Sequence, residues 1–557
     1  MPPCQPTSRR FLAAVVRPAL AVLAASMLLA GPIPGRAESP EEQAATTAAY
    51  DKVIQQEIRA GWERRGVQPA SRCDDRVFVR RLSLDLLGRI PTTREVETYL
   101  ADGRADRRAQ LVRHLLQSED YVHHFADVFD TLLMGRGKDR DYDERQRHHW
   151  RSYLEGVFRD DRAWNEVVRE LLMARPNRPE ERGSVWFLYE RKDDAQRIAE
   201  AVAPGLFGFR IECAQCHDHP LADEIEQRHY WGLVAFFNRG KNVQTKNGPR
   251  ISESAIGGFS DFADLAGGSS PNLLAFLNAV TIDEPRPAAE QKQSDEASLY
   301  VPAPVEGDPR VPKFSRREKF ATEVAAAHPL IARAVVNRVW AIMMGRGIVH
   351  PFNEMDSVHL PSHPELLDRL TEIFVDSGQQ IRPLVEAIAQ SEAYQLRSDF
   401  ADNAVGTSGA SDPAAFSHYL ERPLTAEQLA RSFQIALRGT HQNDHPLTAV
   451  FRPQFPDVLP PENISTVKEA MFLSNNSAVE QFLQGSFEPK HLLASAADCD
   501  APDRRAEMMF AAILHRSPTD EELARLQQFW AASKDRRAGI AAAAWALLTS
   551  AEFRFNH

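Results

Sequence analysis

The feature of this sequence that most constrains its fold is a set of helix-start signals spread along the chain. Each signal places Ser or Thr three residues before Glu or Gln. The four pairs are Thr92 with Glu95, Ser362 with Glu365, Thr425 with Gln428 and Thr519 with Glu522. In such a pair the two side chains satisfy backbone N–H groups that have no partner at the start of a helix. Strand-like alternation is scarce, so the sequence predicts a mainly α protein.

The apolar residues follow helical spacing. In residues 227–237, Tyr230, Leu233, Val234 and Phe237 recur at the i, i+3, i+4, i+7 positions of one helix face. Pro329 suits the first position of another helix, because the N–H group that proline lacks would be unpaired there. A stripe follows it, formed by Ile331, Val335, Val339 and Ile342.

Three segments of the chain resemble one another. Each runs from a helix start that contains proline to a Ser-x-x-aromatic sequence, and they cover residues 91–121, 362–394 and 518–553. We interpret them as three related helical hairpins. The alternative is a chance recurrence of common helix punctuation.

The length and composition indicate several folded domains. A chain of 557 residues suggests two to four domains at about 100–200 residues each. The 29 Phe, 10 Tyr and 8 Trp exclude disorder as the main state, and the net charge of −11 gives no basic field for nucleic acid. Proline and glycine accumulate in residues 264–320. We therefore predict a helical domain at 38–263, a linker at 264–320 with a short helix near 272–279 and a short strand pair, and a second helical domain at 321–557. A surface loop is predicted at 402–412.

The first 37 residues have the layout of a secretory signal peptide. Arginines precede an apolar run at 19–30, and a small-residue site ends at Ala37. The run is shorter than the ~20 residues that cross a bilayer. Removing four arginines takes the net charge from −11 to −15. We expect a periplasmic or secreted protein, exported by the general route rather than the twin-arginine route, with no membrane span after cleavage.

The most specific chemical motif is Cys-x-x-Cys-His at Cys213, Cys216 and His217. This pattern is typical of c-type haem attachment, with two thiols as thioether anchors and the histidine as axial ligand of the iron. Aromatic and apolar residues that could cover a porphyrin, or simply form a core, flank the motif. They are Leu206, Phe207, Phe209, Tyr230, Trp231, Phe236 and Phe237.

Two other interpretations of the motif stay open. Zinc could be bound by the two cysteines with His217 and His219, although the adjacent ligands are cramped for one tetrahedral ion. A redox disulfide between Cys213 and Cys216 is the third option. The sixth ligand of a haem iron is undetermined. Its candidates are His229, Met343, Met344, Met355, His359 and His363.

Several motifs resemble the planctomycete secreted cytochrome-c-like family, a pairing of two domains of unknown function. In the first half these are RRLSLDLLG at 80–88, IPT at 90–92 and ECAQCHDHP at 212–220; in the second they are HPL at 328–330, VNRVW at 336–340, GRG at 345–347, PSHPELLD at 361–368 and RPLTAEQL at 422–429. The resemblance implies a secreted, mostly helical, two-domain protein. It also implies a place in a large secreted system for degrading organic matter, but no biochemical activity.

The resemblance also raises questions about residues outside the motif. Cys73 and Cys499 depart from the family pattern and form either one disulfide or two separate buried thiols. Asn337, Arg338 and Trp340 are expected, by resemblance, to line a domain interface. The paired histidines at 123–124 and 148–149 are interpreted as surface residues, because neighbours on a helix diverge by 100°.

The sequence thus predicts an exported c-type cytochrome-like protein that carries one haem and passes electrons to an unidentified redox partner or secreted degradative assembly. One alternative is an extracytoplasmic binding or scaffold protein with a structural zinc or no metal. Another is a hydrolase-like enzyme with its site in the second half, where Asn353, Glu354, Met355 and Asp356 precede Ser362 and His363.

Overall fold

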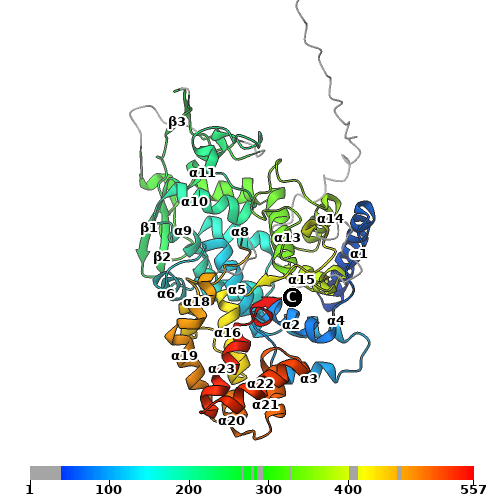
Figure 1. Cartoon of the computed structure of the whole chain (residues 1–557). Coiled ribbons are helices and arrows are strands. Elements are labelled where there is room, and N and C mark those ends of the chain that lie inside the picture. The colour runs from blue at the N-terminus through cyan, green and yellow to red at the C-terminus, as the bar shows by residue number, and fades with distance from the viewer. Residues whose placement is uncertain are drawn as a thin grey trace, which may run out of the picture.

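The computed structural model describes residues 39–265, 267–277, 281–284, 293–326, 328–399, 412–460 and 467–557. The predicted signal peptide and nearly all of the predicted loop at 402–412 lie outside these ranges. The described residues form 24 α-helices and four two-stranded antiparallel sheets, which confirms the mainly α fold (Figure 1). None of the described helices is both long and apolar enough to cross a membrane.

The first half of the chain, which carries the cysteine motif between its last two helices, is built from helices. They are α1 (Pro40–Arg65), α2 (Asp75–Leu87), α3 (Thr93–Leu100), α4 (Arg107–Leu116), α5 (Glu119–Met134), α6 (Asp139–Arg147), α7 (Trp150–Arg159), α8 (Trp164–Met173), α9 (Trp186–Tyr189), α10 (Ala195–Val202) and α11 (Gln227–Phe237). The helix predicted at 227–237 is therefore confirmed.

Three strand pairs lie between residues 240 and 312, and the fourth joins residues 422–423 to the end of the chain. The pairs are β1 (Gly240–Thr245) with β2 (Gly248–Glu253), β3 (Asp261–Ala263) with β4 (Ser269–Pro271), β5 (Tyr300–Val301) with β6 (Val311–Pro312), and β7 (Arg422–Pro423) with β8 (Phe555–Asn556). The predicted strand pair is present, but the short helix near 272–279 is wrong, because the described residues 272–277 are not helical. Instead, the backbone N–H of Asn272 donates to the backbone oxygen of Ser260 at 2.9 Å, and Leu274 forms an isolated β-bridge with Ile282.

The second half is again built from helices. They are α12 (Arg316–Lys319), α13 (Pro329–Met344), α14 (Pro364–Asp376), α15 (Ile381–Gln390), α16 (Ala426–Arg438), α17 (Pro446–Phe451), α18 (Val467–Asn475), α19 (Ser477–Gln484), α20 (Leu492–Asp498), α21 (Pro502–Ile513), α22 (Asp520–Ala532), α23 (Arg536–Thr549) and α24 (Ala551–Arg554). Pro329 begins α13, as the sequence predicts.

Three of the four predicted capping boxes are present, at the starts of α3, α16 and α22. The fourth is wrong. Helix α14 begins at Pro364, and its N-cap is His363 rather than Ser362. The Ser362 hydroxyl donates instead to the backbone oxygen of Ile348, 3.2 Å away, and so holds the preceding loop.

The three related segments end in the same hydrogen-bonded turn. In each, the serine hydroxyl donates to the carbonyl oxygen three residues earlier at 2.7 Å and accepts from the N–H three residues later. The serines are Ser118, Ser391 and Ser550. Each follows two successive helices, α3 and α4, α14 and α15, or α22 and α23. The same arrangement of two successive helices therefore recurs in the three segments that are similar in sequence.

The hydrophobic core does not divide at the predicted linker. One cluster of buried apolar residues extends from Tyr50 to Tyr419, and a second joins Leu84 and Ile90 to residues from 424–553. The buried Asp85 carboxylate connects distant parts of the chain. It accepts from Tyr394 (2.8 Å), Tyr419 (3.0 Å), Arg422 (2.5 Å) and Asn556 (2.7 Å). In Figure 1 the C-terminus accordingly lies beside α2.

Candidate functional site

The cysteine motif lies on a tight turn at the surface, between α10 and α11. Residues Glu212–Gln215 form a single 3₁₀ turn, in which side chains three residues apart lie one above the other. Cys213 and Cys216 are both exposed and both free thiols, while Ala214 between them is fully buried. The turn therefore presents two neighbouring thiols to solvent from a backbone that is anchored in the core.

Helix α11 holds this turn in place. The backbone oxygen of Gln215 accepts from the side-chain amide of Gln227 at 3.2 Å and from the indole N–H of Trp231 at 3.0 Å. The backbone N–H of Gln227 donates to the Asp218 carboxylate at 2.8 Å. The Gln227 amide also donates to Ala263 at 3.0 Å, so the β3 strand lies beside the turn. These contacts fix the backbone on both sides of His217.

The hydrogen bonds distinguish the three histidines of this segment. Nδ1 of His217 lies 2.6 Å from the carbonyl oxygen of Asp218, which can only accept, so Nδ1 carries the proton and Nε2 keeps its lone pair. In His219, Nδ1 accepts from the backbone N–H of Ala222 at 2.9 Å, and in His229 it accepts from that of Glu226 at 3.1 Å. Neutral His219 and His229 therefore carry the proton on Nε2. Burial also lowers the pKa of His229.

A ready-made zinc site is not found in the part of the chain that the structure describes. No three His, Cys, Asp or Glu side chains within it are placed to hold one metal ion. The lone pair of the His219 imidazole is already used by the backbone. These residues do fit covalent attachment of a haem, since both thiols are accessible and His217 has Nε2 available.

The aromatic residues that flank the motif mainly form core. Phe207 packs on Phe276 at 4.7 Å between ring centroids, and Phe236 packs on Phe320 at 4.8 Å. Trp231 differs, because it is only partly buried and stacks on Phe262 at 6.5 Å. Leu221 and Leu265, which are 70% and 77% exposed, lie close in sequence to the turn and to β3. The apolar surface near the thiols is therefore open rather than enclosed.

The candidate sixth ligands are spread over several environments. Met343 and Met344 are buried in α13, and His363 is buried in contact with the ring of Phe416. The backbone N–H of Met355 donates to Gly208, five residues before Cys213, at 2.9 Å. His359 lies between two carboxylates, with Nδ1 2.8 Å from Asp356 and Nε2 3.2 Å from Glu354. The choice among them stays a prediction.

The acidic group of the second half is assembled differently from the prediction. Glu354 and Asp356 contact His359, whereas Ser362 and His363 contact the core and the Ile348 carbonyl. The backbone N–H and the hydroxyl of Ser357 donate to Glu224 at 2.7 and 2.6 Å. The loop that follows the cysteine motif is thereby tied to the second half of the chain.

Four further predictions can be compared with the geometry. Arg338 is buried and donates to the carbonyls of Pro204 and Gly205 at 2.8 Å, so it does join the two halves. Cys73 and Cys499 are both free, which favours separate thiols over a bridge, although Cys499 is only half-buried. The surface interpretation is wrong for His124, which is buried against Gly88 and Arg431. His148 stacks on Trp186 at 4.5 Å.

Comparison with known families identifies both halves without assigning an activity. A family described as a protein of unknown function (DUF1549) matches residues 53–242, and a second one (DUF1553) matches residues 316–456. Searches of curated proteins and of solved structures give no match. The predicted paired architecture is therefore present: the chain carries a DUF1549 domain followed by a DUF1553 domain.

Proposed function

We propose that this protein transfers electrons and carries one c-type haem on Cys213, Cys216 and His217. The observation that carries the proposal is the state of the His217 imidazole. Its Nδ1–H is held by the Asp218 carbonyl, and this is the arrangement in which ligating histidines present Nε2 to a metal. The neighbouring imidazoles of His219 and His229 are in the opposite tautomer.

The thiols support the same proposal. Each would add its S–H across one vinyl group of the porphyrin, which forms a thioether without any oxidant. Cys213 lies in the 3₁₀ turn, Cys216 directly follows it, and both are exposed, so both thiols are accessible from solvent. Bound there, the haem would supply a one-electron redox couple. Gln227 and Trp231 would keep the backbone of the turn fixed while the charge changes.

The open surroundings of the turn favour electron transfer over chemistry on a small substrate. Both thiols are exposed, and the exposed side chains of Leu221 and Leu265 lie close in sequence to the turn and to β3. A group attached here would be reachable by a partner protein. The predicted export agrees, since c-type haem is attached outside the bacterial cytoplasm.

Co-expression with a c-type haem maturation system tests the proposal. We expect the purified exported protein to show a c-type pyridine haemochrome spectrum and a haem that stays bound after denaturation. Cys213→Ser and Cys216→Ser should each lose one thioether, while the matched control Cys499→Ser should keep both. A colourless wild-type protein with free or disulfide-bonded Cys213 and Cys216 would overturn the proposal.

The histidines allow a sharper version of this experiment. His217→Gln should alter the visible spectrum of the attached haem, because it removes the axial ligand. His219→Gln should leave the spectrum unchanged, since a backbone N–H already occupies the His219 ring nitrogen. Equal effects of the two substitutions would contradict the assignment of His217.

A further inference from the structure

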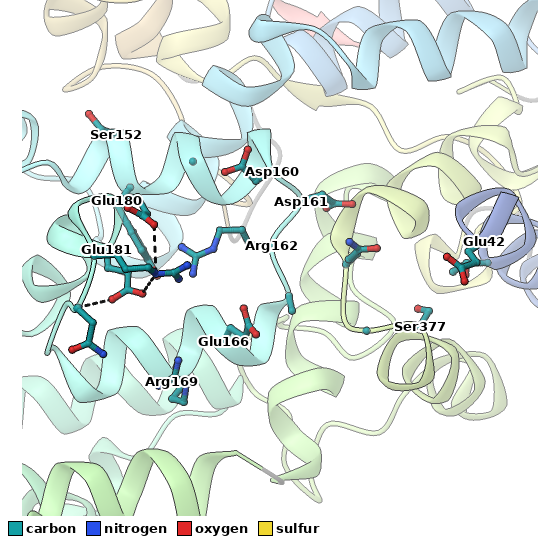
Figure 2. A pocket seen from close by; sticks show the side chains of 18 of the residues that line it. Glu42, Ser152, Asp160, Asp161, Arg162, Glu166, Arg169, Glu180, Glu181 and Ser377 are labelled. Carbon is teal, nitrogen blue, oxygen red and sulfur yellow. Dashed lines mark hydrogen bonds and ion pairs between the residues drawn. The ribbon is translucent and has the colours of Figure 1, made fainter. Parts of the chain in front are cut away.

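A half-buried arginine without a partner indicates a second candidate site, in the second half of the chain. In the cavity of about 1380 Å³ between α1, α7, α8 and the end of α14, Arg178 lies 3.4 Å from Glu180 and 2.7 Å from Glu181 (Figure 2). Arg346, by contrast, lines a smaller cavity of about 380 Å³ and forms no ion pair or hydrogen bond with any residue that the structure describes. A guanidinium group in this state can bind an anion.

The outer nitrogens of Arg346 are the ones that a ligand can reach. Nε is buried without a hydrogen bond, whereas the side chain as a whole is only half-buried and lines the cavity, so its accessible polar atoms are the two Nη nitrogens. Burial lowers the pKa of Arg346, and Asp412, the carboxylate that opposes this effect, is already paired with Arg65 at 2.7 Å. The cavity therefore contains a planar fork of N–H donors that no side chain neutralises.

The backbone on both sides of this guanidinium is fixed by the fold. Gly345 ends α13 with a φ of 78°, and a Cβ atom there would lie only 3.4 Å from that of Leu420, on another wall of the cavity. The side chain of Asn337 accepts from the backbone N–H of Val349 at 2.9 Å and donates to its carbonyl oxygen at 3.0 Å. His350 follows directly and lines the cavity too. The binding groups are thus held in place before any ligand arrives.

The charges of the lining limit the ligand to a single negative charge. Among the lining residues that the structure describes, Arg346 is the only permanent cation, and Glu421 carries a carboxylate. Burial lowers the pKa of His350 and of His418, so both imidazoles are neutral at pH 7. A dianion such as sulfate would therefore keep one charge without compensation, whereas a carboxylate can accept two parallel N–H bonds from the fork.

The remaining groups of the lining suit a ligand with hydroxyl groups. The hydroxyl of Ser398 donates to Oε1 of Glu421 at 2.9 Å, and this exposed carboxylate keeps further lone pairs for other donors. A neutral imidazole offers one N–H donor and one acceptor nitrogen, which matches a hydroxyl group. The apolar part of the wall consists of Pro413, Leu420 and Pro460. The C–H groups of a small ring can pack on such a surface.

We propose that this cavity binds a hydroxylated monocarboxylic acid of the size of one sugar acid. Its carboxylate would accept N–H bonds from Arg346, while its hydroxyl groups would donate to Glu421 and form hydrogen bonds with His350. Donors on the ligand are needed at Glu421, because two carboxylates in one cavity otherwise repel each other. The volume of about 380 Å³ lies in the range of roughly 300–1,000 Å³ that is usual for small-molecule sites.

Calorimetric titration of the complete exported protein with glucuronate tests this site, whether or not haem is attached. We expect saturable binding of one glucuronate, weaker binding of acetate, which has no hydroxyl groups, and no binding of glucose, which has no charge. Arg346→Gln should weaken glucuronate binding at least about tenfold, because it removes charge-assisted hydrogen bonds. The matched control Arg59→Gln removes an exposed arginine outside the cavity and should leave the affinity unchanged.

A second variant separates recognition of the hydroxyl groups from recognition of the charge. Glu421→Ala should weaken glucuronate binding about fivefold, the effect of one hydrogen bond, and should not weaken acetate binding. Because Glu421 is exposed, this variant also tests the proposal if Arg346→Gln fails to fold.

Four results would each overturn the proposal. They are absence of glucuronate binding, equal binding of glucose, unchanged glucuronate affinity in Arg346→Gln, and an unchanged ratio of glucuronate to acetate affinity in Glu421→Ala. The cavity shares no residue with the cysteine turn. A colourless protein that binds glucuronate would therefore refute only the haem proposal.

Discussion

Buried histidines of this protein are kept neutral by the groups around them. Nδ1 of His515 lies 3.2 Å from the guanidinium of Arg80, and Nε2 donates to the Pro91 carbonyl at 2.8 Å. Burial first, and then the charge of Arg80, lower the pKa of His515 to about 3. Burial and the charge of Arg431 lower that of His124 to about 3 as well. Both values lie below the 6.5 of an exposed histidine.

These two pKa values predict a loss of stability in mild acid. As the pH falls through 6.5, the unfolded chain takes up a proton at each residue while the folded chain does not. The free energy of unfolding should therefore drop by about 2 kcal/mol per histidine between pH 7 and pH 5. Urea unfolding at pH 7 and pH 5 measures this change in the free energy of unfolding. His515→Gln, which never takes up a proton, should show about 2 kcal/mol less loss, and an identical loss would contradict the prediction.

At the scale of single residues, the sequence predicts which side chains form a chemical motif better than it predicts their burial and hydrogen bonds. The spacing of Cys213, Cys216 and His217 is visible in the sequence, but the proton position on His217 depends on a turn that only the structure describes. His123 and His124 are both predicted to be surface residues, because neighbours on a helix diverge by 100°. This angle means that the side chains of His123 and His124 point in different directions, but it does not determine which of them faces the core. In the structure His124 does. Arg346 is visible in the GRG motif at 345–347, but the lack of a partner among the described residues is a property of the fold.

At the scale of helices, most of the starts and ends could be predicted. The capping boxes at Thr92, Thr425 and Thr519 use only contacts between residues close in sequence. The capping box predicted at Ser362 is wrong because its hydroxyl donates to the backbone oxygen of Ile348, fourteen positions earlier. A rule based on neighbouring residues does not include such a distant partner. The repeated turns at Ser118, Ser391 and Ser550 are local again, which explains why the sequence predicted these segments.

Two helical glycines should respond in opposite ways to the same substitution. A Cβ on Gly232 in α11 would lie 2.0 Å from the backbone oxygen of Ala275, whereas a Cβ on Gly156 in α7 would meet no atom within 4 Å. Gly232→Ala should therefore destabilise the fold by about 1–3 kcal/mol. Gly156→Ala should stabilise it by up to about 1 kcal/mol through helix propensity. Thermal unfolding of both variants measures this, and a stabilised Gly232→Ala would contradict the packing described for α11.

At the scale of the whole molecule, the two halves share a core that the linker composition did not reveal. Apolar residues of α13 and α14 belong to the same cluster as those of α2, α5 and α7. Arg338 reaches the carbonyls of Pro204 and Gly205. Sequence patterns report which face of a helix is apolar, but pairing between faces hundreds of residues apart is a long-range property.

Separation of the halves should consequently prevent folding. A fragment of residues 38–263 would expose the apolar surface that α13 and α14 cover, and Asp85 would lose Tyr394, Tyr419, Arg422 and Asn556. We expect this fragment to bind the dye ANS and to lack near-ultraviolet circular dichroism. Co-expression with residues 264–557 should restore both signals to those of the intact chain. Cooperative urea unfolding of the fragment alone would refute the shared core.

The short strand β8 sets an order for the biosynthesis of this protein. Its residues Phe555 and Asn556 pair with β7, and Asn556 also donates to the Asp85 carboxylate. A ribosome makes residue 85 some 470 positions before the partner that completes its surroundings. During that interval the Asp85 carboxylate lacks the hydrogen bonds from Tyr394, Tyr419, Arg422 and Asn556 that it accepts in the folded protein. The hydrogen-bond shell of Asp85 is therefore completed only after the whole chain has been synthesised.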